Sequence, residues 1–156
     1  MRISKLSIFL LSVVILTSCA SAKKAKIRQQ RIETVINTAK GFIGTPYKWG
    51  GTSRSGIDCS GLLCNSFRMV SYDLPRTSAA QSEVGKKVKR KKLEAGDLVF
   101  FATGKKKRKI THVGLVTEAR GDKVKFIHSS SSLGVVISDL NMKYYRKRFR
   151  FGRRPF

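Results

Sequence analysis

Acidic residues are scarce in this chain. Only 9 Asp and Glu stand against 33 Lys and Arg, which gives a formal net charge of +24 over 156 residues. Such an excess says nothing about the fold, but it predicts attraction to anionic partners such as nucleic acid, phospholipid headgroups or an acidic polymer. Apolar residues make up 41% of the chain, so a core can form and disorder of the whole chain is not expected. The length is that of one ordinary domain.

Histidine and cysteine are also rare, with two and three residues respectively. His112 and His128 have no Asp or Cys partner at the spacing of a zinc site, so we expect neither a metal nor another cofactor. Cys59 and Cys64 lie five residues apart. On one helix they would point about 140° apart around the axis and could not form a disulfide.

The chain has no apolar run long enough for a confident transmembrane helix. Its first 20 residues, "MRISKLSIFLLSVVILTSCA", hold two basic residues and then an apolar run over 6–16, the layout of a secretory signal. The end of this segment, "LTSC", resembles a bacterial lipobox. The resemblance implies thioether lipidation of Cys19, cleavage of the chain before that residue and acylation of the new amino terminus. It predicts a signal peptide over 1–18 and a lipidated cysteine with a short polar tether over 19–26; the alternative is an ordinary signal peptide that ends near a cysteine.

Export has consequences for partners and location. A secreted chain meets no cytosolic nucleic acid, so the basic charge does not predict nucleic-acid binding. Several acyl chains on Cys19 would form a stable membrane anchor. Ala20, rather than Asp, follows that cysteine. If the source has two membranes, the resemblance to sorted lipoproteins implies the outer membrane, facing the periplasm. We expect a monomer.

The remaining chain predicts one α+β domain over 27–156, with N-terminal helices packed on a central antiparallel β-sheet. Helical spacing of apolar residues runs from 27 to 43, and a second helix is expected over 59–70. Four segments are typical of β-strands: 97–102, 111–118, 123–129 and 134–138.

Two clusters of basic residues interrupt this pattern, "KKVKRKK" over 86–92 and "KKKRK" over 105–109. Loop charge that is merely solvated explains such clusters. The alternative is attraction to anionic headgroups or to the carboxylates of a wall polymer. The sequence leaves both interpretations open.

Cys59 follows a good helix N-cap residue, Asp58, and therefore falls in the first turn of a helix. Helix-start N–H groups and the helix dipole favour a thiolate there, and the same N–H groups could hold an oxyanion. Gly61 keeps the turn uncrowded. Cys64 lies deeper in the helix among apolar residues, where a small buried thiol is expected.

A thiol nucleophile needs a base, and the base needs an orienting partner. If the hairpin between the second and third strands pivots on Arg120, His112 and His128 lie opposite each other on one face of the sheet. His112 could then take the proton of Cys59 while His128 fixes its tautomer. A loop of even length would shift the register by one residue and place the two histidines on opposite faces.

Five segments in order resemble the NlpC/P60 cysteine peptidases of bacterial cell walls, whose fold is papain-like: "GTPYKWGGTSRSGIDCSGLLCNSF", "LPRTSAAQ", "LEAGDLVFF", "THVGLVTE" and "FIHSSSSLGVVIS". The resemblance covers residues from about 31 to 148. It implies that Cys59 is the nucleophile, His112 the base and His128 the third polar member of the triad.

The resemblance also implies roles for three neighbours of the nucleophile. Tyr47 matches a tyrosine near the oxyanion region, and Asp58 and Ser60 match residues that related enzymes use toward the peptide substrate. Packing for Tyr47 and capping for Asp58 and Ser60 are the alternatives.

The implied function is that of a peptidoglycan hydrolase, a thiol protease cleaving amide bonds in stem peptides or cross-links. One alternative is a catalytically silent wall-binding lipoprotein, although the cysteine and both histidines are present. The other is an amidase or acyltransferase using the same Cys/His core. Sequence does not decide which bond is cut.

Overall fold

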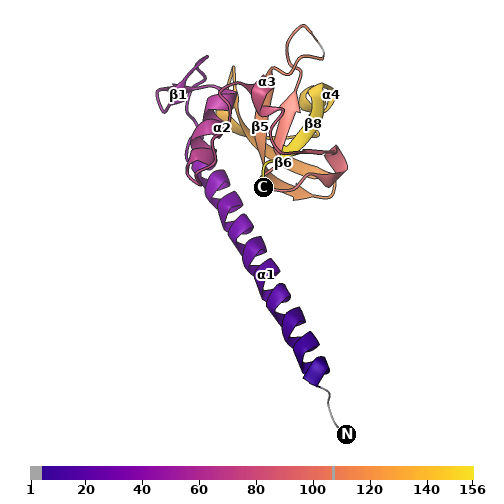
Figure 1. Cartoon of the computed structure of the whole chain (residues 1–156). Coiled ribbons are helices and arrows are strands. Elements are labelled where there is room, and N and C mark those ends of the chain that lie inside the picture. The colour runs from indigo at the N-terminus through magenta and orange to yellow at the C-terminus, as the bar shows by residue number, and fades with distance from the viewer. Residues whose placement is uncertain (1–4, 107) are drawn as a thin grey trace. The chain divides into compact units, whose positions relative to one another are not determined.

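The computed structural model describes the backbone of residues 5–106 and 108–156, and the side chains of 21–106 and 108–156 (Figure 1). The chain divides into two compact units, residues 1–31 and residues 32–156. The second unit holds the sheet and all of the predicted site residues except Cys19, whose side chain lies outside the described residues, as do residues 1–4 of the predicted signal segment.

Helix α1 (Lys5–Lys40) is much longer than the helix predicted from residue 27. The segment 20–26, expected to be an irregular tether, is helical in the structure. Its sequence, "ASAKKAK", consists largely of Ala and Lys, which are strong helix formers, so the helix continues through it. Within the described side chains, no helix combines the length and apolar character needed to cross a membrane.

The core of the second unit is a six-stranded antiparallel sheet with the order β3-β8-β4-β5-β6-β7. The four predicted strands correspond to β4 to β7, and β3 and β8 were not predicted. Their bounds are β3 (Lys86–Val88), β4 (Leu98–Phe101), β5 (His112–Arg120), β6 (Lys123–Ser130), β7 (Gly134–Asp139) and β8 (Phe149–Arg154). A small two-stranded sheet, β1 (Thr52–Ser53) with β2 (Gly56–Ile57), precedes the nucleophile segment.

The remaining helices are short: α2 (Cys59–Arg68), α3 (Ser78–Gln81), the 3-10 turn η1 (Arg90–Lys92) and α4 (Lys143–Arg148). Residues of α1 from 32 onward and residues of α2 pack with Leu98, Phe100 and Leu115 on one face of the sheet. A second cluster, including Val99, Phe101 and Phe126, fills the other face, where Tyr145 of α4 joins it. The prediction of an α+β, papain-like domain with helices packed on an antiparallel sheet is confirmed.

The predicted pivot of the β5–β6 hairpin is wrong. Arg120 pairs with Lys123, so the turn consists of the two residues Gly121 and Asp122. Gly121 has a φ of +57°, which suits a tight two-residue turn. With this even-length turn alone, the two site histidines would lie on opposite faces of the sheet.

A β-bulge restores their common face. Val116 pairs with Phe126 and Glu118 with Lys125, so Thr117 is an extra residue on β5. One extra residue shifts the register by one, and side chains beyond it change faces relative to the partner strand. Both histidines therefore lie on one face, as diagonal neighbours rather than directly opposite each other.

Candidate active site

A cleft of about 510 Å³ collects the predicted chemistry. Cys59, His112 and His128 all line it, with Tyr47 and Trp49 at its border with a second hollow of about 230 Å³. Cys59 belongs to α2 and the histidines to β5 and β6, so the start of the helix and one end of the sheet meet here. The structure therefore brings the three predicted triad residues together.

The start of α2 is fixed by its cap. Asp58 is the N-cap residue, and its carboxylate accepts a hydrogen bond of 2.7 Å from the backbone N–H of Gly61. A Cβ atom at position 61 would lie 2.5 Å from the carbonyl oxygen of Gly51, so this turn requires glycine. The first turn is thereby held tightly against the preceding loop, with Cys59 only 8% exposed.

Burial dominates the acidity of the nucleophile. It raises the pKa of the Cys59 thiol to about 11, although backbone hydrogen bonds with Val113, Ser60 and Cys59 itself favour the thiolate. The negative charge of Asp58 also disfavours it. The helix-start N–H groups, which were predicted to favour the thiolate, do lower the pKa of Cys59, but burial has the larger effect in the resting site.

The two histidines form a direct pair. Nε2 of His112 lies 3.0 Å from Nδ1 of His128, and the rings are nearly perpendicular, at 88°. Burial lowers the pKa of His112 to about 4, and burial together with the nearby His112 lowers the pKa of His128 to about 3. Both imidazoles are thus neutral at physiological pH. Since His112 uses Nε2 toward His128, its Nδ1 is the nitrogen available to take a proton from Cys59.

Ser138 and Tyr145, which the sequence did not single out, contact His128 on the side of its ring away from His112. Nε2 of His128 lies 3.0 Å from Oγ of Ser138 and 3.1 Å from Oη of Tyr145. The ring of Tyr145 packs edge-on against that of His128 and belongs to α4, which was not predicted. If these oxygens accept a hydrogen bond from the Nε2–H of His128, its Nδ1 carries no proton and accepts a hydrogen bond from the Nε2–H of His112. That tautomer leaves Nδ1 of His112 as a base.

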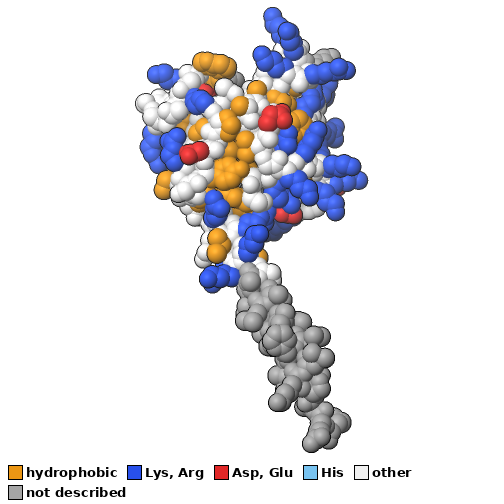
Figure 2. Space-filling view, in the orientation of Figure 1, with side chains coloured by type: hydrophobic (Ala, Val, Ile, Leu, Met, Phe, Trp, Pro, Cys, Tyr) orange, Lys and Arg blue, Asp and Glu red, His pale blue; other side chains and the backbone are white. Residues whose placement is uncertain are grey.

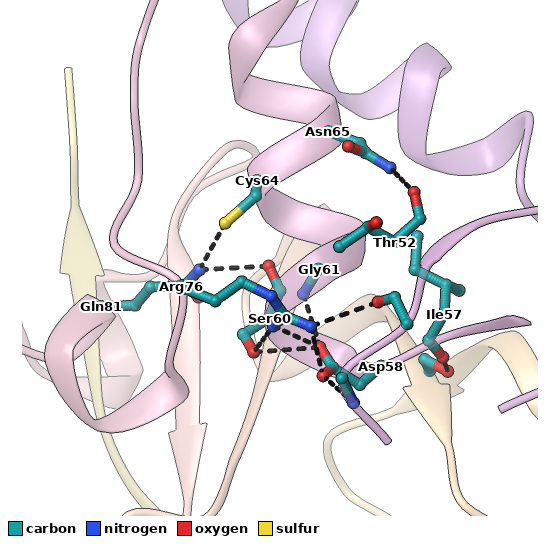
Figure 3. A network of polar contacts seen from close by, with 12 residues as sticks. Thr52, Ile57, Asp58, Ser60, Gly61, Cys64, Asn65, Arg76 and Gln81 are labelled. Atoms are coloured by element: carbon teal, nitrogen blue, oxygen red, sulfur yellow. Dashed lines mark hydrogen bonds and ion pairs between the residues drawn. The ribbon is translucent and has the colours of Figure 1, made fainter. Parts of the chain in front are cut away.

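Asp58 and Ser60 belong to an ionic network with Arg76 (Figure 3). The guanidinium of Arg76 donates to both carboxylate oxygens of Asp58, at 2.9 and 2.7 Å. Burial by itself raises the pKa of Asp58, but hydrogen bonds from Arg76, Gly61 and Ser60 hold it below its usual value. The structure places Asp58 as a charged helix cap, and Ser60 as a bridge between that carboxylate and Arg76.

The second thiol faces the protein interior, on the other side of the network. Cys64 is buried, and its sulfur lies 3.4 Å from the carbonyl oxygens of Leu74 and Pro75. Gln81 donates to Cys64 and to the carbonyl oxygen of Ser60 (Figure 3). It also donates to the carbonyl oxygen of Pro75. Cys59 and Cys64 are both free thiols. Arg76 and Gln81 lie within "LPRTSAAQ", so that segment was the available signal for this network.

Tyr47 lies beside the nucleophile. It lines both hollows, and its backbone bridges to Ile57, just before the cap residue. Burial raises the pKa of Tyr47, and the charges of Cys59 and Asp58 raise it further. The hydroxyl therefore stays protonated and can donate a hydrogen bond near the sulfur. A bond of 2.7 Å from Oγ of Ser129 to the carbonyl oxygen of Ile57 ties the strand after His128 to this segment.

Among the described residues, no group of three or more His, Cys, Asp or Glu side chains is arranged to hold a metal ion. The ionisable side chains that line the larger cleft are Cys59, the two histidines and the tyrosines Tyr47, Tyr144 and Tyr145. The side chain that contacts Nε2 of His112 is His128, not a carboxylate.

Comparisons with known proteins match most of the chain. A sequence model of the NlpC/P60 family matches residues 44–154. The murein DD-endopeptidase MepS/murein LD-carboxypeptidase of Escherichia coli K12 is 42% identical over 112 residues, covering 71% of this chain and 56% of that protein. The probable endopeptidase NlpC of the same strain is 34% identical over 155 residues, covering 94% and 97%. Among solved structures, an NlpC/P60 family protein from Bacillus cereus superposes with a TM-score of 0.71 at 36% identity, over 79% of this chain and 39% of that one. The chain thus spans little more than half the length of the first of these relatives.

Proposed function

Because the chain belongs to the NlpC/P60 family, we propose that it is a peptidoglycan hydrolase, a cysteine endopeptidase that cleaves amide bonds in stem peptides or their cross-links. The observation that carries the proposal is the meeting of Cys59, His112 and His128 in one open cleft. The relative named above as a murein DD-endopeptidase supports the substrate class.

The first step is a proton transfer within a neutral pair. The thiol of Cys59 gives its proton to Nδ1 of His112 as its sulfur attacks the amide carbon. The resulting imidazolium donates Nε2–H to Nδ1 of His128, across the 3.0 Å contact. His128 thus stabilises the positive charge without itself changing protonation. Because thiol and imidazole both rest uncharged, charge appears only as the bond to substrate forms.

The oxyanion needs donors at the start of α2. The backbone N–H groups of Cys59 and Ser60 form hydrogen bonds with the sulfur of Cys59, so they lie next to the atom that attacks the substrate. With the protonated hydroxyl of Tyr47, they would stabilise the tetrahedral intermediate. His112 then protonates the leaving amine as the carbon–nitrogen bond breaks. Water, deprotonated by His112, hydrolyses the thioester and releases the thiol.

The wall of the cleft suits a peptide substrate. Hydroxyl groups dominate its polar lining, since Ser129 to Ser132, Thr103 and Thr111 all contribute. Hydroxyls both donate and accept hydrogen bonds, so they can bind the amide groups of an extended peptide. The Asp58–Arg76 ion pair lines only the smaller hollow on the far side of Cys59. The two hollows would thus bind the parts of the substrate peptide on either side of the scissile bond.

The proposed setting is the membrane surface. Lipidation of Cys19 would anchor the chain, in the outer membrane facing the periplasm if the source has two membranes. A helical segment over 20–26 rises only about 10 Å, less than half its extended length, so the domain would act close to the lipid. Either of the two basic clusters, 86–92 or 105–109, could contact anionic headgroups. The cluster at 86–92 contains β3 and η1, and none of its residues lines the cleft.

The test is a Cys59→Ala variant incubated with purified muropeptides, with products identified by mass spectrometry. Loss of the nucleophile should reduce turnover on the order of 10⁴-fold or more. Cys64→Ala is the matched control, because the same change at the inward-facing thiol should leave turnover within about tenfold of wild type, the scale of one core substitution that does not touch the reaction. Near-normal cleavage by Cys59→Ala would contradict the proposal, and the wild-type products identify the bond that is cut.

A further inference from the structure

One of the two basic clusters adjoins the catalytic cleft. Lys105, Lys106, Arg108 and Lys109 belong to the loop between β4 and β5, and residues at the two ends of that loop, Thr103, Gly104 and Thr111, line the cleft. Oγ1 of Thr111 accepts hydrogen bonds from the backbone N–H groups of Thr103 and Gly104, at 2.9 and 3.2 Å. These hydrogen bonds hold the two ends of the loop together at the cleft, and the basic residues follow directly in the chain.

Helix α4 extends the same basic border. Its Tyr144 and Tyr145 line the cleft, and the carbonyl oxygen of Arg148 accepts a bond of 3.0 Å from the N–H of Ala102, at the start of the basic loop. The helix and the loop are thus neighbours. In Figure 2, basic side chains gather at the upper right, where Figure 1 places this loop and α4. We call the exposed basic residues of the two elements the cationic rim: Lys105, Lys106, Arg108, Lys109, Lys143, Arg146 and Lys147.

Among the described residues, ion pairs engage Arg76, Lys125, Arg153 and Arg154, none of which belongs to the rim. No charged side chain of the described residues lines the larger cleft itself. A neutral cleft with a border of one sign of charge focuses the field at its mouth and attracts ligands of the opposite sign.

We propose that the cationic rim recognises free carboxylates on the stem peptide being cleaved, so that the enzyme prefers acidic stem peptides to amidated ones. The inference rests on the proposed function and adds a determinant of specificity to it. Position favours this partner over lipid headgroups, because the rim adjoins the cleft that holds the nucleophile. A carboxylate-bearing peptide in the cleft would lie within a Debye length of these cations, about 8–10 Å at physiological salt.

The cluster at 86–92 provides a matched control. It lies on the edge strand β3 and on η1, none of its residues lines either hollow, and Arg90 there bonds to Asn141. Removing the same number of charges from this cluster changes the net charge equally without touching the rim. The rim variant carries Lys105→Gln, Lys106→Gln, Arg108→Gln and Lys109→Gln, and the control variant carries Lys86→Gln, Lys89→Gln, Lys91→Gln and Lys92→Gln.

The experiment measures kcat/KM of the full chain in detergent on one muropeptide, with its carboxylates either free or chemically amidated. At low salt, the rim variant should lose about tenfold or more on the free substrate and little on the amidated one. The control variant should match wild type on both. At 1 M salt, where the Debye length is about 3 Å, the difference between wild type and the rim variant should largely vanish.

Three outcomes would overturn the inference. Equal losses in rim and control variants would mean that only net charge matters. If the rim variant kept the wild-type preference for the substrate with free carboxylates, the rim would not be what recognises carboxylates. Unchanged cleavage with lost binding to phosphatidylglycerol vesicles would assign the rim to the membrane. A wild-type chain that cleaves neither substrate would instead overturn the proposed function, and this inference with it.

Discussion

At the scale of single residues, the site is a chain of neutral groups. Burial raises the pKa of Cys59 to about 11 and lowers that of His112 to about 4, so neither is charged at neutral pH. The tautomer of His112 then decides whether Cys59 can lose its proton. That tautomer is set through His128 by the hydroxyls of Ser138 and Tyr145.

Replacing Tyr145 by Phe should slow the reaction although it removes no group that reacts with the amide carbon of the substrate. With one acceptor for Nε2–H gone, His128 more often carries its proton on Nδ1, which forces His112 into the wrong tautomer. One neutral hydrogen bond corresponds to about 0.5–1.5 kcal/mol, or roughly two- to tenfold in kcat. Adding Ser138→Ala should lower kcat further.

Tyr144→Phe is the matched control for this prediction. Tyr144 lies next in the chain and lines the same cleft, but its hydroxyl does not bond to His128. Its change should leave kcat near wild type. Equal losses in the two variants, or a Tyr145→Phe loss confined to KM, would show that Tyr145 serves the shape of the cleft and not the tautomer of the base.

At the scale of elements, the bulge in β5 decides whether the site exists. The turn at Gly121 and Asp122 sets a register that separates the histidines, and the extra residue Thr117 reverses that separation. The bulge lies between the turn and the site. Length changes on the two sides of the bulge should therefore have different effects.

Deleting Thr117 should abolish cleavage even in protein that still folds, because His112 would move to the other face from His128. Inserting one glycine between Gly121 and Asp122, beyond the bulge, should only lengthen the turn and keep most activity. Circular dichroism establishes that each variant is folded, and turnover of muropeptides gives the result. An active Thr117 deletion variant would contradict the register argument.

Much of the element pattern could be predicted from the sequence, and the failures have physical causes. Strands β4 to β7 are rich in β-branched and aromatic residues, so propensity and alternation identify them. Strand β8, "FRFGRR", and helix α4, "KYYRKR", are rich in basic residues, and they are defined by the pairing of β8 with β3 and β4 and by the packing of Tyr145. The β-bulge in β5 could not be recognised in the sequence. The contact between the histidines was therefore predicted from a hairpin register that is wrong.

The triad residues themselves were predictable, but their ionisation was not. The place of Cys59 after a capping Asp58 distinguishes it from Cys64 by helix position alone. How deeply the helix start is buried depends on the loop packed over it, including the close approach of Gly51 to Gly61. That depth is the largest cause of the raised pKa of the thiol.

At the scale of the whole molecule, one buried and one partly buried neutral histidine, His128 and His112, make the fold sensitive to acid. Their pKa values fall from about 6.5 in the unfolded chain to about 4 for His112 and about 3 for His128. The unfolded chain therefore binds more protons below pH 6.5. The stability that both groups contribute is complete above that pH and is lost as the pH falls toward 4.

By pH 5, each histidine should reduce the free energy of unfolding by about 2 kcal/mol, measured by urea denaturation of the full chain. The chain holds only these two histidines, so a double variant, His112→Gln with His128→Gln, should have nearly constant stability between pH 7 and pH 5. A double variant with the same acid dependence as wild type would trace the effect to other groups.

The central claim is that Cys59, and not Cys64, is acylated by a stem peptide in the cleft. The most direct measurement is mass spectrometry of the full chain quenched in acid during turnover of a muropeptide and then digested with trypsin. Both cysteines fall in one tryptic fragment, residues 55–68, so fragmentation must assign the adduct. The account predicts a thioester on Cys59 that is absent from Cys59→Ser. An adduct on Cys64, or undiminished product formation by Cys59→Ser, would contradict it.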